Sequence, residues 1–141
     1  MRHEGRCHCG NLTVVFESAR APADTPLRVC QCTFCRRHGS TALTDPAGRI
    51  EIRWKDPGEV SRYRFGLRSS DFLVCRTCGV FVAGLCEVDG RTYATLNANV
   101  LEDRAAFTQV PQPMDYDGEE LAARLARRAR VWTPAIASPT A

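Results

Sequence analysis

The sequence predicts a mainly β domain with one C-terminal α-helix, and three observations support that prediction. Short segments that alternate apolar with polar residues follow one another, with turn residues between them. Cysteine clusters lie at the ends of several of these segments. A later segment has apolar residues at helical spacing. A chain of 141 residues has single-domain size and can bury a core without disulfides, and we expect residues 1–132 to form that domain.

The expected strands are short and are bounded by turn signals. Residues 50–54 alternate cleanly, as a half-buried strand does. Asp89-Gly90 has the composition of a two-residue hairpin turn, and two Asp-Pro pairs followed by glycine mark turns at 45–48 and 56–58. The expected strands are residues 12–16, 41–44, 50–54, 60–65, 72–74, 80–85, 85–88 and 91–96.

One strong helix is expected over about residues 118–131. Leu121, Leu125 and Trp132 mark its apolar side, and glutamates precede arginines along it in the order that the helix dipole favours. The arginine run is interpreted as a solvated helix face rather than a nucleic-acid-binding patch. Residues 133–141 are small and include proline, so we expect them to form a disordered tail.

Composition and charge exclude several classes of function. The net charge is +3, and all but one of the 19 basic residues are arginine, the exception being Lys55. The 16 acidic residues are interleaved with them, so nucleic acid is not an expected partner. No apolar stretch approaches the ~18 residues of a membrane span, and the polar N-terminus lacks a signal-peptide pattern. We therefore expect a cytoplasmic protein that does not bind membranes.

Seven of the eight cysteines fall into three clusters whose spacing suits metal ligation. Cysteines one or three residues apart rarely form a relaxed disulfide, whereas such turns aim two thiolates at one point. The first and third clusters each offer two thiolates and lie far apart in the sequence, as in a closed four-cysteine zinc site. The expected ligands of this structural zinc are Cys7, Cys9, Cys75 and Cys78.

The middle cluster supplies three thiolates within six residues, Cys30, Cys32 and Cys35, and is the expected second zinc site. Its fourth ligand stays open between His38, the weaker candidate Cys86, and a water or an external thiol. A thiol bound at an open zinc loses its proton and becomes a nucleophile, so these three cysteines are the expected catalytic centre. The alternatives are a labile structural zinc and an empty site.

The order of the three clusters and their flanking glycines resembles the glutathione-dependent formaldehyde-activating enzyme family, which includes centromere protein V. The resemblance spans residues 5–99 and extends to an aromatic strand around Tyr63. Its motifs are Gly5-x-Cys7-x-Cys9-Gly10, Cys30-x-Cys32-x-x-Cys35-Arg36 with Gly39 after it, and Phe72-x-x-Cys75-x-x-Cys78-Gly79.

This resemblance implies a β-tent (Mss-four-like) fold of zinc-stapled antiparallel sheets and two zinc ions per chain. The implied activity joins glutathione to formaldehyde, which is carbon–sulfur lyase chemistry run in reverse. The chain departs from the family at residues 111–117, which lack the usual histidine and tryptophan, and an arginine-rich helix follows. That departure leaves the substrate of this chain open.

The enzyme hypothesis is that a small thiol such as glutathione binds at the second zinc and attacks a small carbonyl. Arg36 follows the last ligand of that site and is the first choice to bind the carboxylates of the thiol. The other candidates are Arg37, Arg62, Arg64 and Arg68. Two alternatives are a non-catalytic zinc module that binds protein or nucleic acid through the helix at 119–131, and a zinc store or redox sensor. The oligomeric state stays open.

Overall fold

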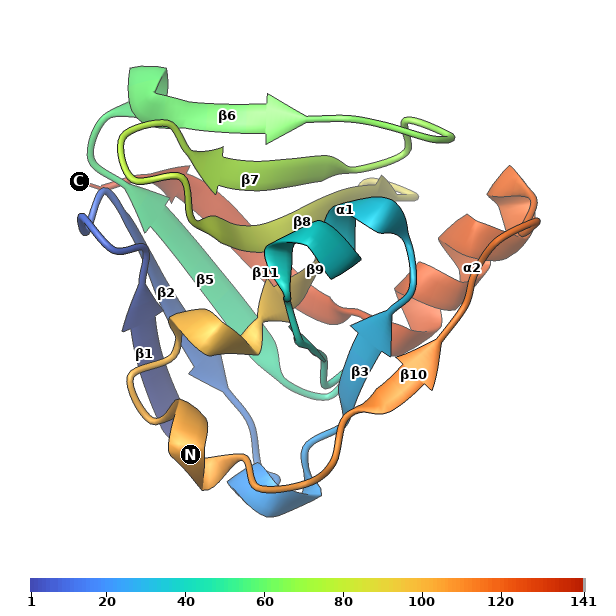
Figure 1. Cartoon of the computed structure of the whole chain (residues 1–141), viewed down its shortest axis with the longest axis horizontal. Coiled ribbons are helices and arrows are strands. Elements are labelled where there is room, and N and C mark those ends of the chain that lie inside the picture. Colours follow the sequence, from blue (N-terminus) through green and yellow to red (C-terminus); the bar gives the residue numbers. More distant parts are fainter. Residues whose placement is uncertain (141) are drawn as a thin grey trace.

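The computed structural model describes residues 1–140 and shows a mainly β fold with a C-terminal helix, as predicted (Figure 1). The helices are α1 (Thr33–His38) and α2 (Leu121–Val131), and four 3₁₀ turns, η1–η4, lie at Pro22–Asp24, Pro57–Glu59, Ala98–Val100 and Arg104–Ala106. The strands are β1 (Arg2–Arg6), β2 (Leu12–Glu17), β3 (Leu27–Cys30), β4 (Ala42–Leu43), β5 (Arg49–Trp54), β6 (Val60–Tyr63), β7 (Asp71–Cys75), β8 (Phe81–Val88), β9 (Arg91–Asn97), β10 (Gln112–Met114) and β11 (Thr133–Pro139). No helix within residues 1–140 has the length and apolar character needed to cross a membrane.

The strands form one continuous, strongly folded sheet. Its main path runs β1-β2-β5-β11-β9-β4-β3-β10, and β8 leaves this path at β9 to carry β7 and then β6. In Figure 1 the β1–β2–β5 portion makes one wall, and β6 and β7 lie above it. Eight of the ten pairings are antiparallel, as expected, and the two parallel ones, β3 with β10 and β5 with β11, both use C-terminal strands.

Alternating side chains explain why β2 and β5 pair in their observed register. Leu12, Val14 and Phe16 point into the core, and they lie opposite Trp54, Ile52 and Ile50. A shift by one residue would turn both apolar sets toward solvent, so burial fixes the register. The predicted strands at 12–16 and 50–54 are thereby confirmed.

The predicted hairpin at Asp89-Gly90 is also present. Val88 pairs with Arg91 across a two-residue turn in which both Asp89 and Gly90 have positive φ angles, 52° and 76°. Positive φ at both central residues is the requirement of a type I′ turn, which matches the twist of the flanking strands.

The prediction that residues 133–141 are disordered is wrong for the residues that the structure describes. Residues 133–139 form β11, which pairs in parallel with β5 and antiparallel with β9, while Ala141 lies outside the described residues. Small side chains do not prevent a segment from forming a strand when two neighbouring strands offer it backbone N–H and C=O groups. Ala135 and Ala137 pack against the core, and the fully buried Thr133 accepts a hydrogen bond from the Asp45 backbone N–H.

The N-terminal residues form a strand, β1, that contributes to the core. His3 is 3% exposed in β1 and packs against Phe16 and Phe107. Its Nδ1 lies 2.6 Å from Asp103 Oδ2. β1 was not predicted because its sequence is polar. Its buried side chain is an imidazole that lies between exposed charged residues, so the sequence shows no apolar alternation.

Candidate metal centres and the adjoining cavity

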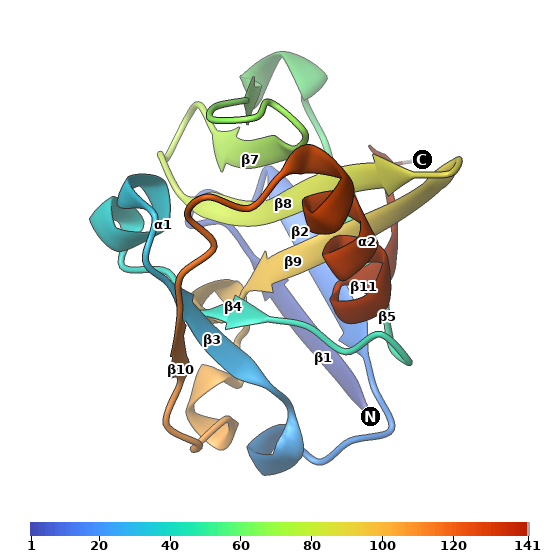
Figure 2. The same ribbon diagram turned by 90° about the vertical axis from the view of Figure 1, so that its right-hand side faces the viewer.

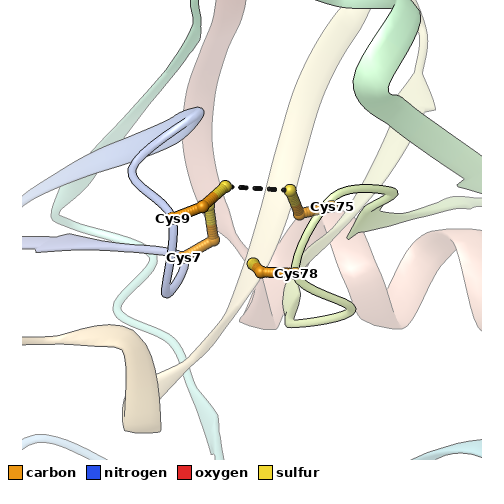
Figure 3. Close-up of side chains that lie close together, drawn as sticks. All are labelled: Cys7, Cys9, Cys75 and Cys78. Atoms are coloured by element: carbon orange, nitrogen blue, oxygen red, sulfur yellow. Dashed lines mark hydrogen bonds between the residues drawn. The ribbon is translucent and has the colours of Figure 1, made fainter.

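The first and third cysteine clusters meet at one point in the fold. Cys7 and Cys9 lie in the turn between β1 and β2, whereas Cys75 ends β7 and Cys78 lies in the turn that leads to β8 (Figure 3). Their four sulfur atoms all lie within 4.8 Å of one another. The Cys7–Cys9 and Cys9–Cys75 sulfur separations are 3.8 and 3.5 Å, close to the edge of about 3.8 Å expected for thiolates around tetrahedral zinc.

Both turns have the local structure that brings two thiols to one point. Each pair of cysteines is followed by a glycine with positive φ, Gly10 at 87° and Gly79 at 81°. The Leu12 N–H donates to Cys7 Sγ over 3.3 Å, and the Cys75 N–H donates to the Val80 carbonyl. These two glycines are needed for the backbone conformation of the turns, because other residues rarely adopt positive φ angles.

Two thiols of the four-cysteine cluster, those of Cys75 and Cys78, have pKa values shifted in opposite directions. Burial raises the pKa of Cys75 to about 12. Burial opposes ionisation of Cys78 too, but backbone hydrogen bonds with Cys9 and Val80 and neighbouring thiols lower its pKa to about 6. Cys78 therefore loses its proton more readily than Cys75, and a metal cation at this point would favour the thiolate of Cys75.

The middle cluster also converges. Cys30 ends β3, Cys32 is the N-cap of α1, and Cys35 lies in the first turn of that helix, with all three sulfur atoms within 4.8 Å of one another. Hydrogen bonds from Cys30 and Cys35 hold the pKa of Cys32 far below its usual range, and hydrogen bonds with Cys30 and Cys32 raise the pKa of Cys35. The Cys35 N–H also donates to Cys32 Sγ. The arrangement fits three ligands on one face of a metal ion.

The candidates for a fourth protein ligand lie elsewhere. The His38 ring packs against Phe34 and Phe81, with centroids 4.5 and 5.5 Å apart. Cys86 is buried in β8, where its thiol donates to the Ser69 carbonyl. Within residues 1–140, the group around the three sulfurs includes no further His, Cys, Asp or Glu.

A cavity of about 210 Å³ lies beside the three-cysteine cluster. Cys30, Cys32 and Cys35 line it on one side, and helix α2 lines it on another. Figure 2 shows α2 lying against the β8–β9 portion of the sheet, with the preceding segment running past α1. The remaining lining residues are Arg28, Ala42, Thr44, Phe65, Phe72, Thr95, Asp115, Tyr116 and Asp117, and the α2 side contributes Arg124, Arg127, Arg128, Val131 and Trp132.

The arginines that face this cavity are not the ones that sequence reasoning selected. Arg36 is exposed on α1 and does not line the cavity. Arg62 and Arg64 form ion pairs with Asp71 outside it. Arg37 and Arg68 are also exposed and do not line it.

Sequence reasoning missed Arg124, Arg127 and Arg128 because the α2 run was interpreted as a solvated face, and it gave no reason to select Arg28 in β3. The available signal was their spacing: Arg124, Arg127 and Arg128 share one side of a helix, three and four residues apart.

One carboxylate fixes two of these arginines in place. Glu119 accepts hydrogen bonds from Arg124 Nε at 3.1 Å and Arg127 Nε at 2.9 Å. The Arg127 guanidinium also stacks on the Tyr116 ring, 3.6 Å from its centroid. The hydrogen bond from Arg127, and then that from Arg124, lowers the pKa of Glu119. This network ties the segment before α2 to the helix and shapes that side of the cavity.

The fold and the two sulfur clusters define a class of mainly β proteins whose cysteines are compatible with zinc binding. The model of the family described as glutathione-dependent formaldehyde-activating enzyme matches residues 2–114, and the chain belongs to that family. A crystal structure of a Rhodobacter sphaeroides protein is 28% identical, with a TM-score of 0.59, and the match covers 77% of this chain and 98% of that one. The predicted family and fold class are confirmed, while α2 and β11 lie beyond the matched residues.

Proposed function

We propose that this protein adds a small thiol such as glutathione to formaldehyde or a related small carbonyl. The reaction is of the carbon–sulfur lyase type, run in the direction of synthesis. One observation carries the proposal: the three thiols of Cys30, Cys32 and Cys35 face a cavity of about 210 Å³, large enough for part of a small substrate. Membership of the family supplies the class of reaction.

The proposal assigns different roles to the two clusters. Cys7, Cys9, Cys75 and Cys78 hold a structural zinc that joins two turns, and Cys30, Cys32 and Cys35 hold a second zinc at the cavity. Zinc at the second site, when bound, lowers the pKa of a thiol that reaches it, so that the thiol is a nucleophile near neutral pH. Both clusters require reduced cysteines, so the proposal includes a reducing cytoplasmic location.

Aromatic residues of this chain line the cavity in which the substrate would bind. Phe65 and Phe72 give the cavity an apolar wall, and Phe34 packs on both rings from the cysteine-bearing helix α1. The substrate sulfur attacks the carbonyl carbon, a carbon–sulfur bond forms, and the carbonyl π electrons move to oxygen. That oxygen takes up one proton while the thiol has lost one, so the addition is balanced and needs no oxidant or reductant.

The alternative of a nucleic-acid-binding module through α2 gains no support from the helix. Arg124, Arg127 and Arg128 line the cavity, whereas Arg130 is exposed. A nucleic-acid surface needs several cations that face solvent together.

The test is the rate at which glutathione and ¹³C-labelled formaldehyde exchange with their adduct, measured by NMR against the uncatalysed rate. We expect the zinc-loaded protein to accelerate exchange and Cys32→Ser to lose at least tenfold of that acceleration. Arg37→Met is the control, because Arg37 is exposed on the same helix and lies outside the cavity. Equal acceleration by Cys32→Ser and the unaltered protein would contradict the proposed catalytic centre.

A further inference from the structure

Arg128 is a buried cation whose charge lacks a carboxylate partner. It lies in the last turn of α2, lines the cavity and is 6% exposed. Among residues 1–140 no Asp or Glu lies within ion-pair distance of it. Nη1 donates to the hydroxyls of Ser69 and Ser70, while Nε is buried without a hydrogen-bond partner.

The groups around Arg128 hold its position but do not neutralise it. Its guanidinium stacks over the Trp132 ring, 4.6 Å from the centroid. Nη1 also donates to the Cys86 sulfur at 3.8 Å, and the Cys86 thiol donates to the Ser69 carbonyl. Burying an unpaired charge is costly, and burial lowers the pKa of this arginine. A cation retained under these conditions is explained by an anion that binds beside it.

The other charges of the cavity leave this position open to a ligand. Arg124 and Arg127 are paired with Glu119. Asp115 and Asp117 are exposed to solvent, which screens their charge, and within residues 1–140 neither forms an ion pair with an arginine. Arg28 reaches the cavity from β3, where its Nη1 donates to Thr44 Oγ1 at 2.8 Å, and within the same residues it too has no acidic partner.

We propose that Arg128, together with Arg28, binds a carboxylate of the substrate thiol, and that the protein therefore selects carboxylate-bearing thiols over neutral ones. The inference rests on the proposed function for the identity of the ligand as a thiol. Guanidinium groups bind carboxylates through charge-assisted hydrogen bonds. Because α2 lies beyond residues 2–114, the contribution of Arg128 comes from a segment outside the matched family region, whereas Arg28 lies within it.

The test measures binding without the reactive thiol. S-methylglutathione, which cannot form a thiolate, is titrated by calorimetry into the zinc-loaded protein and into Arg128→Met, and its dimethyl ester is titrated in parallel. We expect Arg128→Met to weaken binding of S-methylglutathione at least tenfold, and we expect the ester to bind the unaltered protein equally weakly. Arg128→Lys, which keeps the charge, should recover part of the affinity.

Arg130→Met is the matched control, since Arg130 is exposed two residues along the same helix. It should bind S-methylglutathione like the unaltered protein. If Arg128→Met does not fold, Arg28→Met decides the question through the same loss of affinity.

Three results would overturn the inference: no binding to the unaltered protein, unchanged affinity in the folded arginine variant, or equal losses for the acid and its ester. A protein that binds S-methylglutathione through Arg128 but does not accelerate thiol addition would support this site and contradict the proposed function.

Discussion

At the scale of single residues, the fold depends on a few positions where the chain has no steric freedom. Gly5 in β1 is the clearest of them, because the backbone of Val100 and Leu101 crosses directly over its α-carbon. A Cβ there would lie 2.8 Å from the Val100 carbonyl carbon and 2.9 Å from Leu101 Cα. This contact brings the turn at η3 against the strand that leads to Cys7.

Gly5→Ala is expected to destabilise the protein by about 1–3 kcal/mol, since backbone rather than a flexible side chain must move. The measurement is the free energy of unfolding in denaturant at fixed zinc concentration. Gly58→Ala is the control, because its Cβ would meet the flexible Asp56 carboxylate at 3.2 Å. Equal stability of Gly5→Ala and the unaltered protein would show that the crossing is not close.

The residue scale also shows where sequence reasoning succeeds. The cysteines of each cluster are one or three residues apart, so local geometry aims them at one point whatever surrounds them. Cys86, the weaker candidate for a fourth ligand, is buried in β8 outside both clusters. Spacing places the α2 arginines on one side of the helix, but which side faces the cavity depends on distant partners such as Ser69 and Ser70, which accept hydrogen bonds from Arg128.

At the scale of elements, helix α2 is held by the ion-pair network of Glu119. Its N-cap, Glu120, makes no side-chain capping hydrogen bond. The start of the helix is instead held by the ion pairs of Glu119 with Arg124 and Arg127. The Glu119 side chain is 17% exposed, so solvent screens this pairing less than it screens a surface pair.

Glu119→Gln is expected to lower the free energy of unfolding by about 1 kcal/mol at pH 7. The folded-state pKa of Glu119 is lowered, so its stabilisation is present above the unfolded value of about 4.3 and is lost as pH falls through the folded value. Denaturant unfolding of both proteins from pH 7 to pH 3 should therefore show their difference shrinking at the acid end. Glu120→Gln should show little difference at any pH, and a pH-independent gap for Glu119→Gln would contradict this role.

Two of the elements that escaped prediction, β10 and β11, share one physical property. β10 and β11 are stabilised by pairing with β3, β5 and β9, and neither has a strong apolar alternation of its own. Their formation depends on strand edges built by distant sequence, which no local pattern reports. By contrast β2, β5 and the β8–β9 hairpin carry their own alternation or turn signal, and these were predicted.

At the scale of the whole molecule, the two cysteine clusters lie at different kinds of position in the fold. The quartet joins the β1–β2 turn to the β7–β8 turn, which are 66 residues apart between Cys9 and Cys75. The three-cysteine cluster instead lies at the junction of β3 and α1 beside the cavity. This placement supports the proposal that one metal stabilises the fold and the other takes part in the reaction at the cavity.

The zinc content per chain, measured by mass spectrometry of the native protein, tests this division most directly. We predict two zinc ions in the unaltered protein and in Cys86→Ser, whose sulfur lies outside both clusters. Cys30→Ser should retain one zinc ion and a folded chain. A single zinc ion in both the unaltered protein and Cys30→Ser would contradict the account, because the thiols beside the cavity would then hold no metal.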